Sequence, residues 1–220
     1  MMLNQISPYI DFSYFLAIFL LSLSIYFQTR KMQIFSLHRG IRYFRNAFLY
    51  FSMVYLFRFL VLNLQFLIIP PDLEPELSQS GTFLVIFFSF LSVFTLLSSF
   101  LWKRYRFISD NRLALLSLFI ACVTFFIRLP LTLLILGVVA ALFLVLKAYD
   151  SYSKKRQVIS PLFFFYTLLL AFVLFDLVPI TQQTMPFEFR IAGYIGSICV
   201  FVYINLKIRK VLTTGEDEEK

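Results

Sequence analysis

The stretch Arg45–Ile69, RNAFLYFSMVYLFRFLVLNLQFLII, decides how this sequence folds. About 20 consecutive apolar residues are enough for a helix to cross the ~30 Å hydrocarbon core of a bilayer, and this run is longer. One cation, Arg58, interrupts it, about 16 Å along a helix from Ile69 and therefore near the middle of a span. A charge at that depth is costly unless other groups accept its hydrogen bonds. The partner of Arg58 is therefore the main question that the sequence raises.

The composition places the whole chain in the membrane class. Of its residues, 60% are hydrophobic and 15% are charged, and the mean hydropathy is +0.83. Soluble domains carry about 25% charged residues. The net charge of +8 could suggest a nucleic-acid partner, but the Lys and Arg residues stand in short clusters between apolar runs. Such clusters are typical of cytoplasmic loops, so we exclude a nucleic-acid role.

The apolar runs predict an all-α fold, a polytopic bundle of seven transmembrane helices in one domain, residues 1–210. The expected spans are 9–27, 46–69, 82–102, 113–128, 131–147, 161–179 and 190–207.

The region 113–146 allows two interpretations. It is too long for one crossing and is interrupted by Arg128 and Pro130. Both flanking loops are basic, so the chain must cross an even number of times between them. Two short spans are expected, with a re-entrant hairpin as the alternative.

The segments between the first spans also carry signals. Residues 28–45 mix basic and apolar side chains and are expected to lie along the lipid headgroups. Residues 70–81 hold three prolines and three carboxylates, and are expected to form a solvated loop. The acidic end, 211–220, is expected to be a disordered cytoplasmic tail.

The positions of the basic residues predict the orientation. All but three of the 20 Lys and Arg residues fall in 28–46, 102–112, 147–157 and 207–220. Arg58 lies within a span, and Arg128 and Arg190 lie on the opposite side. Positive loops stay in the cytoplasm, so the N-terminus is expected outside and the C-terminus inside. The expected location is the plasma membrane of the cell.

A polar stripe around Arg58 is the leading candidate for a ligand or ion path. Tyr55 and Gln65 share its helix face, at offsets of three and seven residues. Asp176, in the sixth expected span, is the preferred acceptor for Arg58, and Asp11, in the first, is the alternative. The pair could simply lock two helices together, or it could line a water-accessible outer cavity that binds a ligand or moves a proton.

Two weaker groups of residues complete the candidates. Arg128, Glu188 and Arg190 lie near expected span ends, where they would anchor helices or form the rim of an outer opening. Small residues four positions apart permit close helix packing. The pairs of this kind are Gly137 with Ala141 in one span, and Ala192 with Gly196 and Gly193 with Ser197 in the last.

The sequence shows no catalytic or nucleotide-binding motif, and its one His and two Cys predict neither a metal site nor a cofactor. We therefore expect a non-enzymatic sensor, receptor-like or scaffold protein. Its loops are short, so it would signal through a cytoplasmic or membrane protein partner, with anionic lipid headgroups at the basic loops. The alternative is a small solute transporter or channel that uses a path through Arg58 and Asp176. An intramembrane enzyme is the third possibility.

Overall fold

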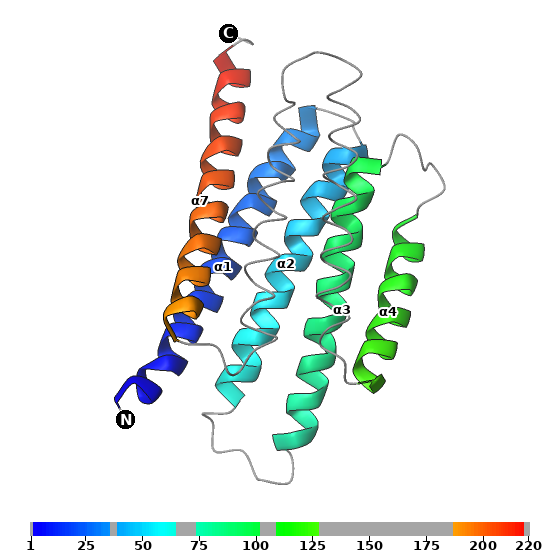
Figure 1. Cartoon of the computed structure of the whole chain (residues 1–220). Coiled ribbons are helices and arrows are strands. Elements are labelled where there is room, and N and C mark those ends of the chain that lie inside the picture. The colour runs from blue at the N-terminus through cyan, green and yellow to red at the C-terminus, as the bar shows by residue number, and fades with distance from the viewer. Residues whose placement is uncertain (1, 36–38, 65–73, 102–108, 128–186, 218–220) are drawn as a thin grey trace, which may run out of the picture. The chain divides into compact units, whose positions relative to one another are not determined.

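The computed structural model describes residues 2–35, 39–64, 74–101, 109–127 and 187–217, and every regular element within these ranges is an α-helix (Figure 1). The all-α prediction is confirmed for this part of the chain. The helices are α1 (Met2–Phe35), α2 (Arg39–Leu64), α3 (Glu74–Leu101), α4 (Asp110–Ile127) and α7 (Phe187–Asp217).

Four of these helices are long and apolar enough to cross a membrane. The apolar stretches are Tyr9–Arg30, Gly40–Asn63, Gln79–Ser99 and Arg190–Lys210. They indicate an integral membrane protein, as predicted. The expected spans 131–147 and 161–179 lie outside the described residues.

The chain divides into two compact units, of which the first holds residues 1–127 and 205–220 and the second holds 128–204. Within the first unit, α2 packs against both α1 and α3, and α3 packs against α4 (Figure 1). Only three residues separate α1 from α2, and a connection this short favours antiparallel neighbours.

Aromatic side chains fix the register of α1 against α2. The rings of Phe12 and Phe59 lie 4.5 Å apart between centroids, and those of Tyr14 and Tyr55 lie 6.0 Å apart at nearly a right angle. At the far end of the pair, the Arg45 guanidinium lies 5.6 Å from the centre of the Tyr26 ring. As numbers rise along α1 the partners fall along α2, so the two helices run antiparallel with a constant register.

Small residues allow α3 to approach its neighbours closely. Ser92, Thr95 and Ser99 are buried, and each hydroxyl donates to a backbone carbonyl three or four residues earlier in the helix. Each hydroxyl thus finds its hydrogen-bond acceptor within its own helix, and the small side chains leave room for a neighbouring helix. At the start of the apolar stretch of α3, a Cβ placed on Gly81 would clash with the Val61 side chain of α2.

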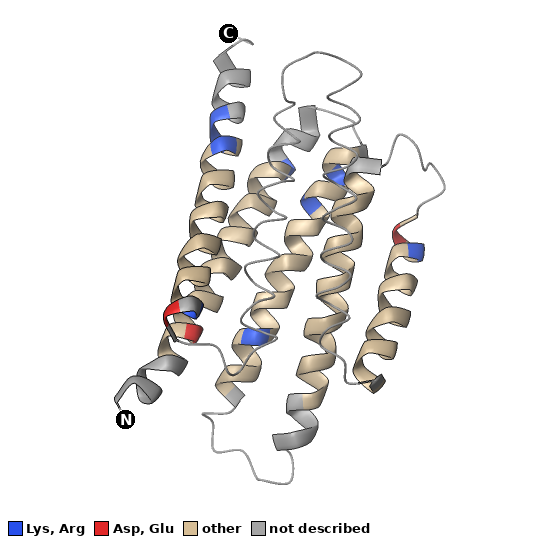
Figure 2. Ribbon diagram, in the orientation of Figure 1, with Lys and Arg blue, Asp and Glu red and all other residues tan. Residues whose placement is uncertain are grey.

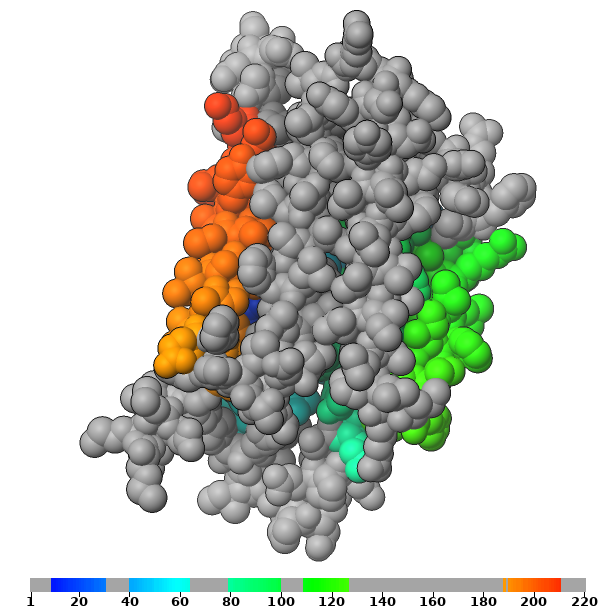
Figure 3. Space-filling view, viewed as in Figure 1, coloured from blue at the N-terminus to red at the C-terminus, as the bar shows by residue number. Residues whose placement is uncertain are grey.

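One face of α4 carries large exposed apolar side chains (green in Figure 3). Its most exposed members are Leu115, Phe119 and Phe126, which are 66%, 68% and 81% exposed. A bilayer core accepts such a face, because a lipid-facing helix needs only to be apolar.

The expected interfacial segment 28–45 is not a separate element in the described residues, and its place along the headgroups stays a prediction. Helix α1 continues to Phe35, and α2 begins at Arg39, with Gly40 in its first turn. Extending an existing helix costs little compared with starting a new one. Long basic side chains can also stay on a helix and still reach the headgroups, so the basic residues did not require a separate element.

The expected loop 70–81 is wrong from Glu74 onward, because α3 begins there. Pro75 falls in the first helical turn, where a backbone N–H has no acceptor within the helix, so the missing donor costs nothing. At the other end of the chain, α7 continues to Asp217, well into the region where a disordered tail was expected. Residues 218–220 lie outside the described part.

Candidate functional site

Arg58 lies on α2 against two aromatic rings. Its guanidinium carbon is 5.1 Å from the centre of the Tyr55 ring and 6.0 Å from that of Phe15 on α1. Tyr55 is 1% exposed, so its ring is held in place by packing. A cation over a ring face gains about 0.5–1 kcal/mol at an exposed site and about 2 kcal/mol when desolvated. The two rings therefore position the charge and lower the cost of its partial burial.

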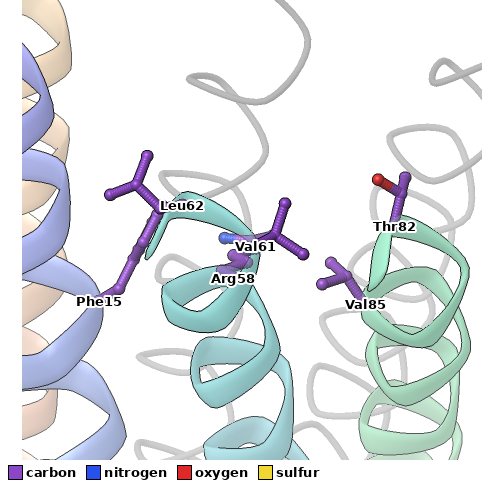
Figure 4. A pocket seen from close by; sticks show the side chains of 6 residues that line it. All are labelled: Phe15, Arg58, Val61, Leu62, Thr82 and Val85. Carbon is purple, nitrogen blue, oxygen red and sulfur yellow. The ribbon is translucent and has the colours of Figure 1, made fainter. Parts of the chain in front are cut away.

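A cavity of about 190 Å³ lies beside Arg58 and is open rather than enclosed. Three neighbouring helices of the first unit form it, and Figure 4 shows Val61 and Val85 pointing toward each other between α2 and α3. The complete lining is Phe15, Arg58, Val61, Leu62, Thr82 and Val85. The walls are mostly apolar, with one cation and one hydroxyl.

The mid-span depth predicted for Arg58 stays a prediction. It was counted from Ile69, and the structure describes α2 only as far as Leu64. A long arginine side chain can carry its charge several ångströms along the helix toward the interface.

Asp11 is the one of the two predicted partners of Arg58 that lies within the described residues. Phe12 of α1 lies opposite Phe59 of α2, so the antiparallel register puts Asp11 level with Leu60. That level is two residues from Arg58, or about 3 Å along the helix axis. Asp11 is partly buried. The other predicted partner, Asp176, and the predicted stripe member Gln65 lie outside the described residues.

A second polar cluster, formed by Ser24, Gln28 and Asn205, was missed by the sequence analysis. The Gln28 amide nitrogen donates to Asn205 Oδ1 at 2.9 Å and to Ser24 Oγ at 3.1 Å. The Asn205 amide nitrogen donates to Ser24 Oγ at 3.1 Å, which closes a ring of three side chains. The ring joins α1 to α7, and Asn205 is 8% exposed. The sequence did offer signals for this cluster: Ser24 and Gln28 are polar and stand four residues apart, and Asn205 is a polar residue in the last apolar run.

Gln28 Oε1 is buried in this cluster, and within the described residues it accepts no hydrogen bond. A buried amide oxygen that is left unsatisfied costs about 1–3 kcal/mol. Among the described residues, no side chain or backbone group donates to this oxygen.

Basic residues gather at the opposite end of the first unit from Arg58. Figure 2 shows them where α1 ends and where α2 and α4 begin. Arg42 and Asp110 form an ion pair of 3.1 Å between α2 and α4, with side chains 43% and 47% exposed. Pairs this exposed contribute about 0–1 kcal/mol. This end of the unit is thus strongly positive, with little internal compensation among the described carboxylates.

The remaining predicted site residues lie in the second unit. Glu188 is exposed and Arg190 is partly buried, both in the first turns of α7, while Arg128 lies outside the described residues. Ser197 is fully buried, and Gly193 and Gly196 are partly buried on the same helix. Gly137 and Ala141 also lie outside the described part.

Metal-ligating side chains do not gather in the described ranges, where no group of three His, Cys, Asp or Glu residues could hold an ion. Cys122 and Cys199 are free thiols.

The chain is similar to an uncharacterized protein of Archaeoglobus fulgidus. The two are 30% identical over 209 residues, an alignment that covers 89% of each chain. No family model matches the sequence. No solved structure matches it either.

Proposed function

We propose a receptor-like role for this chain, which belongs to one family with the uncharacterized protein of Archaeoglobus fulgidus. In this proposal it is a non-enzymatic protein of the cell membrane that binds a ligand beside Arg58 and signals through a partner at its cytoplasmic face. A scaffold that gathers partners without a ligand is the simpler form of the same role.

The proposed architecture has seven spans, with the N-terminus outside and the C-terminus inside. The clustering of basic residues where α1 ends and α2 begins supports this orientation, since positive ends stay in the cytoplasm. Arg58, Asp11 and the cavity then belong to the outer side of the membrane.

The cavity beside Arg58 is the observation that carries the proposal. Its walls come from α1, α2 and α3, so a bound molecule contacts three helices at once. A ligand that binds one packing of these helices better than another shifts the population between them. Such a shift can reach the basic end, where a protein partner or anionic headgroups would respond to it.

A membrane preparation with single reporter cysteines tests the orientation on which this proposal depends. Cys122 and Cys199 are first replaced by Ala, and Ser80→Cys or Ser153→Cys is then introduced. Ser80 is exposed near the start of α3 and should react with an impermeant maleimide from outside. Ser153→Cys should react only after the membrane is opened. The reverse pattern would overturn the proposed orientation, and with it the outer binding site.

The search for a partner tests the signalling role. The protein is cross-linked in native membranes and purified in mild detergent, beside a variant with Arg42, Arg45 and Arg112 changed to Gln. We expect a cytoplasmic or membrane protein that co-purifies with the parent chain and is lost from the variant. Equal recovery from both would argue against a partner at the basic end.

A small solute transporter or channel is the second candidate, and the cluster of Ser24, Gln28 and Asn205 favours it. Gln28 lies 13 residues after Phe15 on α1, so this cluster is about 20 Å from the cavity along the helix. Polar groups at two depths are what a solute path needs. Flux into liposomes that disappears in Arg58→Ala, but not in Arg30→Ala, would favour transport over the receptor role.

A further inference from the structure

The chemistry of Arg58 selects an acidic group as its external ligand. Arginine stays charged at any physiological pH and offers five N–H donors in a planar fork. That fork matches the two oxygens of a carboxylate or phosphate. The rings of Tyr55 and Phe15 lie beside the guanidinium, and Arg58 is part of the cavity lining, where an acidic group can reach it.

The rest of the cavity is suited to hydrocarbon. Val61, Leu62 and Val85 line it together with the Phe15 ring, and Thr82 adds a single hydroxyl. Burying methylene groups against such walls stabilises a bound chain. A ligand with only an acidic group would leave this apolar lining unused.

The size of the cavity decides between a soluble ligand and an amphiphile. Sites for drug-sized ligands measure about 300–1,000 Å³. This one is about 190 Å³, so it would enclose only a small part of such a molecule. One water takes about 30 Å³ of liquid, so the volume suits an acidic head and the first few carbons of a chain. The cavity is open, and the remaining chain can therefore extend beyond it.

We infer that the cavity binds an anionic amphiphile, whose acidic head pairs with Arg58 while the first part of its chain contacts Val61, Leu62 and Val85. This inference rests on the proposed receptor role, and it names the class of ligand. The same chemistry has two sources, an acidic phospholipid of the surrounding bilayer or a free fatty acid.

Binding of radiolabelled decanoate tests the inference. The full chain is placed in phosphatidylcholine nanodiscs, and empty nanodiscs correct for partition into lipid. Decanoate should bind saturably, whereas decanol, which lacks the charge, and inorganic phosphate, which lacks the chain, should compete at least about tenfold more weakly. If phosphate or decanol competes as strongly as unlabelled decanoate, the ligand is not an anionic amphiphile and the inference is overturned.

Two variants locate the binding. Arg58→Gln should weaken decanoate binding at least about tenfold. A hydrogen bond to a charged group contributes at least the free energy that corresponds to a tenfold change in affinity. Arg30→Gln, an exposed arginine on α1, removes the same charge elsewhere and should leave binding unchanged. Val85→Phe keeps Arg58 but fills the cavity, and should also abolish binding. If both Arg58→Gln and Val85→Phe bind decanoate with unchanged affinity, the ligand does not bind in this cavity.

A final comparison separates the two sources. Replacing a third of the phosphatidylcholine with phosphatidylglycerol should weaken decanoate binding if the natural occupant is a bilayer lipid. If decanoate binding is unaffected, the occupant is a free amphiphile. Failure of decanoate to bind at all would overturn the inference alone, because the receptor role is tested separately by the orientation and partner experiments.

Discussion

The Arg58 guanidinium lies 5.1 Å from the centre of the Tyr55 ring, one helical turn earlier on α2, and it also faces Phe15 across the contact with α1. A charge in an apolar helix is thus accompanied by ring faces from its own helix and from the neighbouring one. Arg58 and Tyr55 are both members of the polar stripe that the sequence predicts on this helix.

Tyr55→Leu should lower stability more than Tyr55→Phe does. Leucine removes the ring, and with it about 0.5–2 kcal/mol of cation–π attraction, whereas phenylalanine keeps a ring face for Arg58. Thermal unfolding in one detergent, followed by loss of monodisperse protein, gives the comparison. Equal midpoints for the two variants would show that the ring does not stabilise the charge.

Arg58→Lys should fold but bind decanoate more weakly. Lysine keeps the positive charge and the contact with the rings, but it lacks the planar fork that engages two oxygens. The measurement is the decanoate affinity beside a thermal midpoint. A variant that binds as tightly as the parent chain would show that charge alone is enough.

Asp11→Asn should lower the thermal midpoint and raise the affinity for decanoate. The register places Asp11 about 3 Å from Arg58 along the helix axis, so we expect its carboxylate to compete with an external acid for the same cation. Asp110→Asn removes an exposed carboxylate at the opposite end and serves as the control. If the two variants behave alike, Asp11 does not act on Arg58.

Hydropathy was enough to predict helices at the spans that the structure describes, because a bilayer leaves the backbone few alternatives. It could not predict where those helices end. Residues 28–35 were expected along the headgroups and 74–81 in a loop, yet both belong to helices that contain an apolar stretch. Extending a formed helix costs less than starting a new one. Apolar runs measure contact with lipid, and a helix can extend well beyond it.

The candidate site was predicted in part, for a related reason. Arg58 and Tyr55 were found because a lone charge, and a residue one turn before it, are visible in one helix. Phe15 and Val85 are ordinary apolar residues in the sequence, and only the packing of α1 and α3 against α2 brings them to the cavity. The link from Gln28 to Asn205 joins residues far apart in the chain, which no local pattern indicates.

Gly81→Val should destabilise the contact between α2 and α3. Even one added carbon at Gly81 meets the Val61 side chain, so the helices must separate or Val61 must move. Overpacking of this kind costs about 1–3 kcal/mol. Adding Val61→Ala should restore part of the lost stability, and a double variant no better than Gly81→Val would place the strain elsewhere.

The bonds between Gln28 and Asn205 should show a measurable coupling. Hydrogen bonds between membrane helices average about 0.6 kcal/mol and reach about 1.7 kcal/mol in double-mutant cycles. This pair belongs to a closed ring with Ser24, so we expect a value toward the upper end. The cycle uses Gln28→Ala, Asn205→Ala and the double variant, with unfolding measured in one detergent.

A second cycle serves as the control and pairs Gln28→Ala with Lys210→Ala. Lys210 is exposed and lies on α7, like Asn205, so this cycle should give no coupling. Equal coupling in both cycles would mean that the loss of Gln28 acts through α7 as a whole, and not through the amide bond.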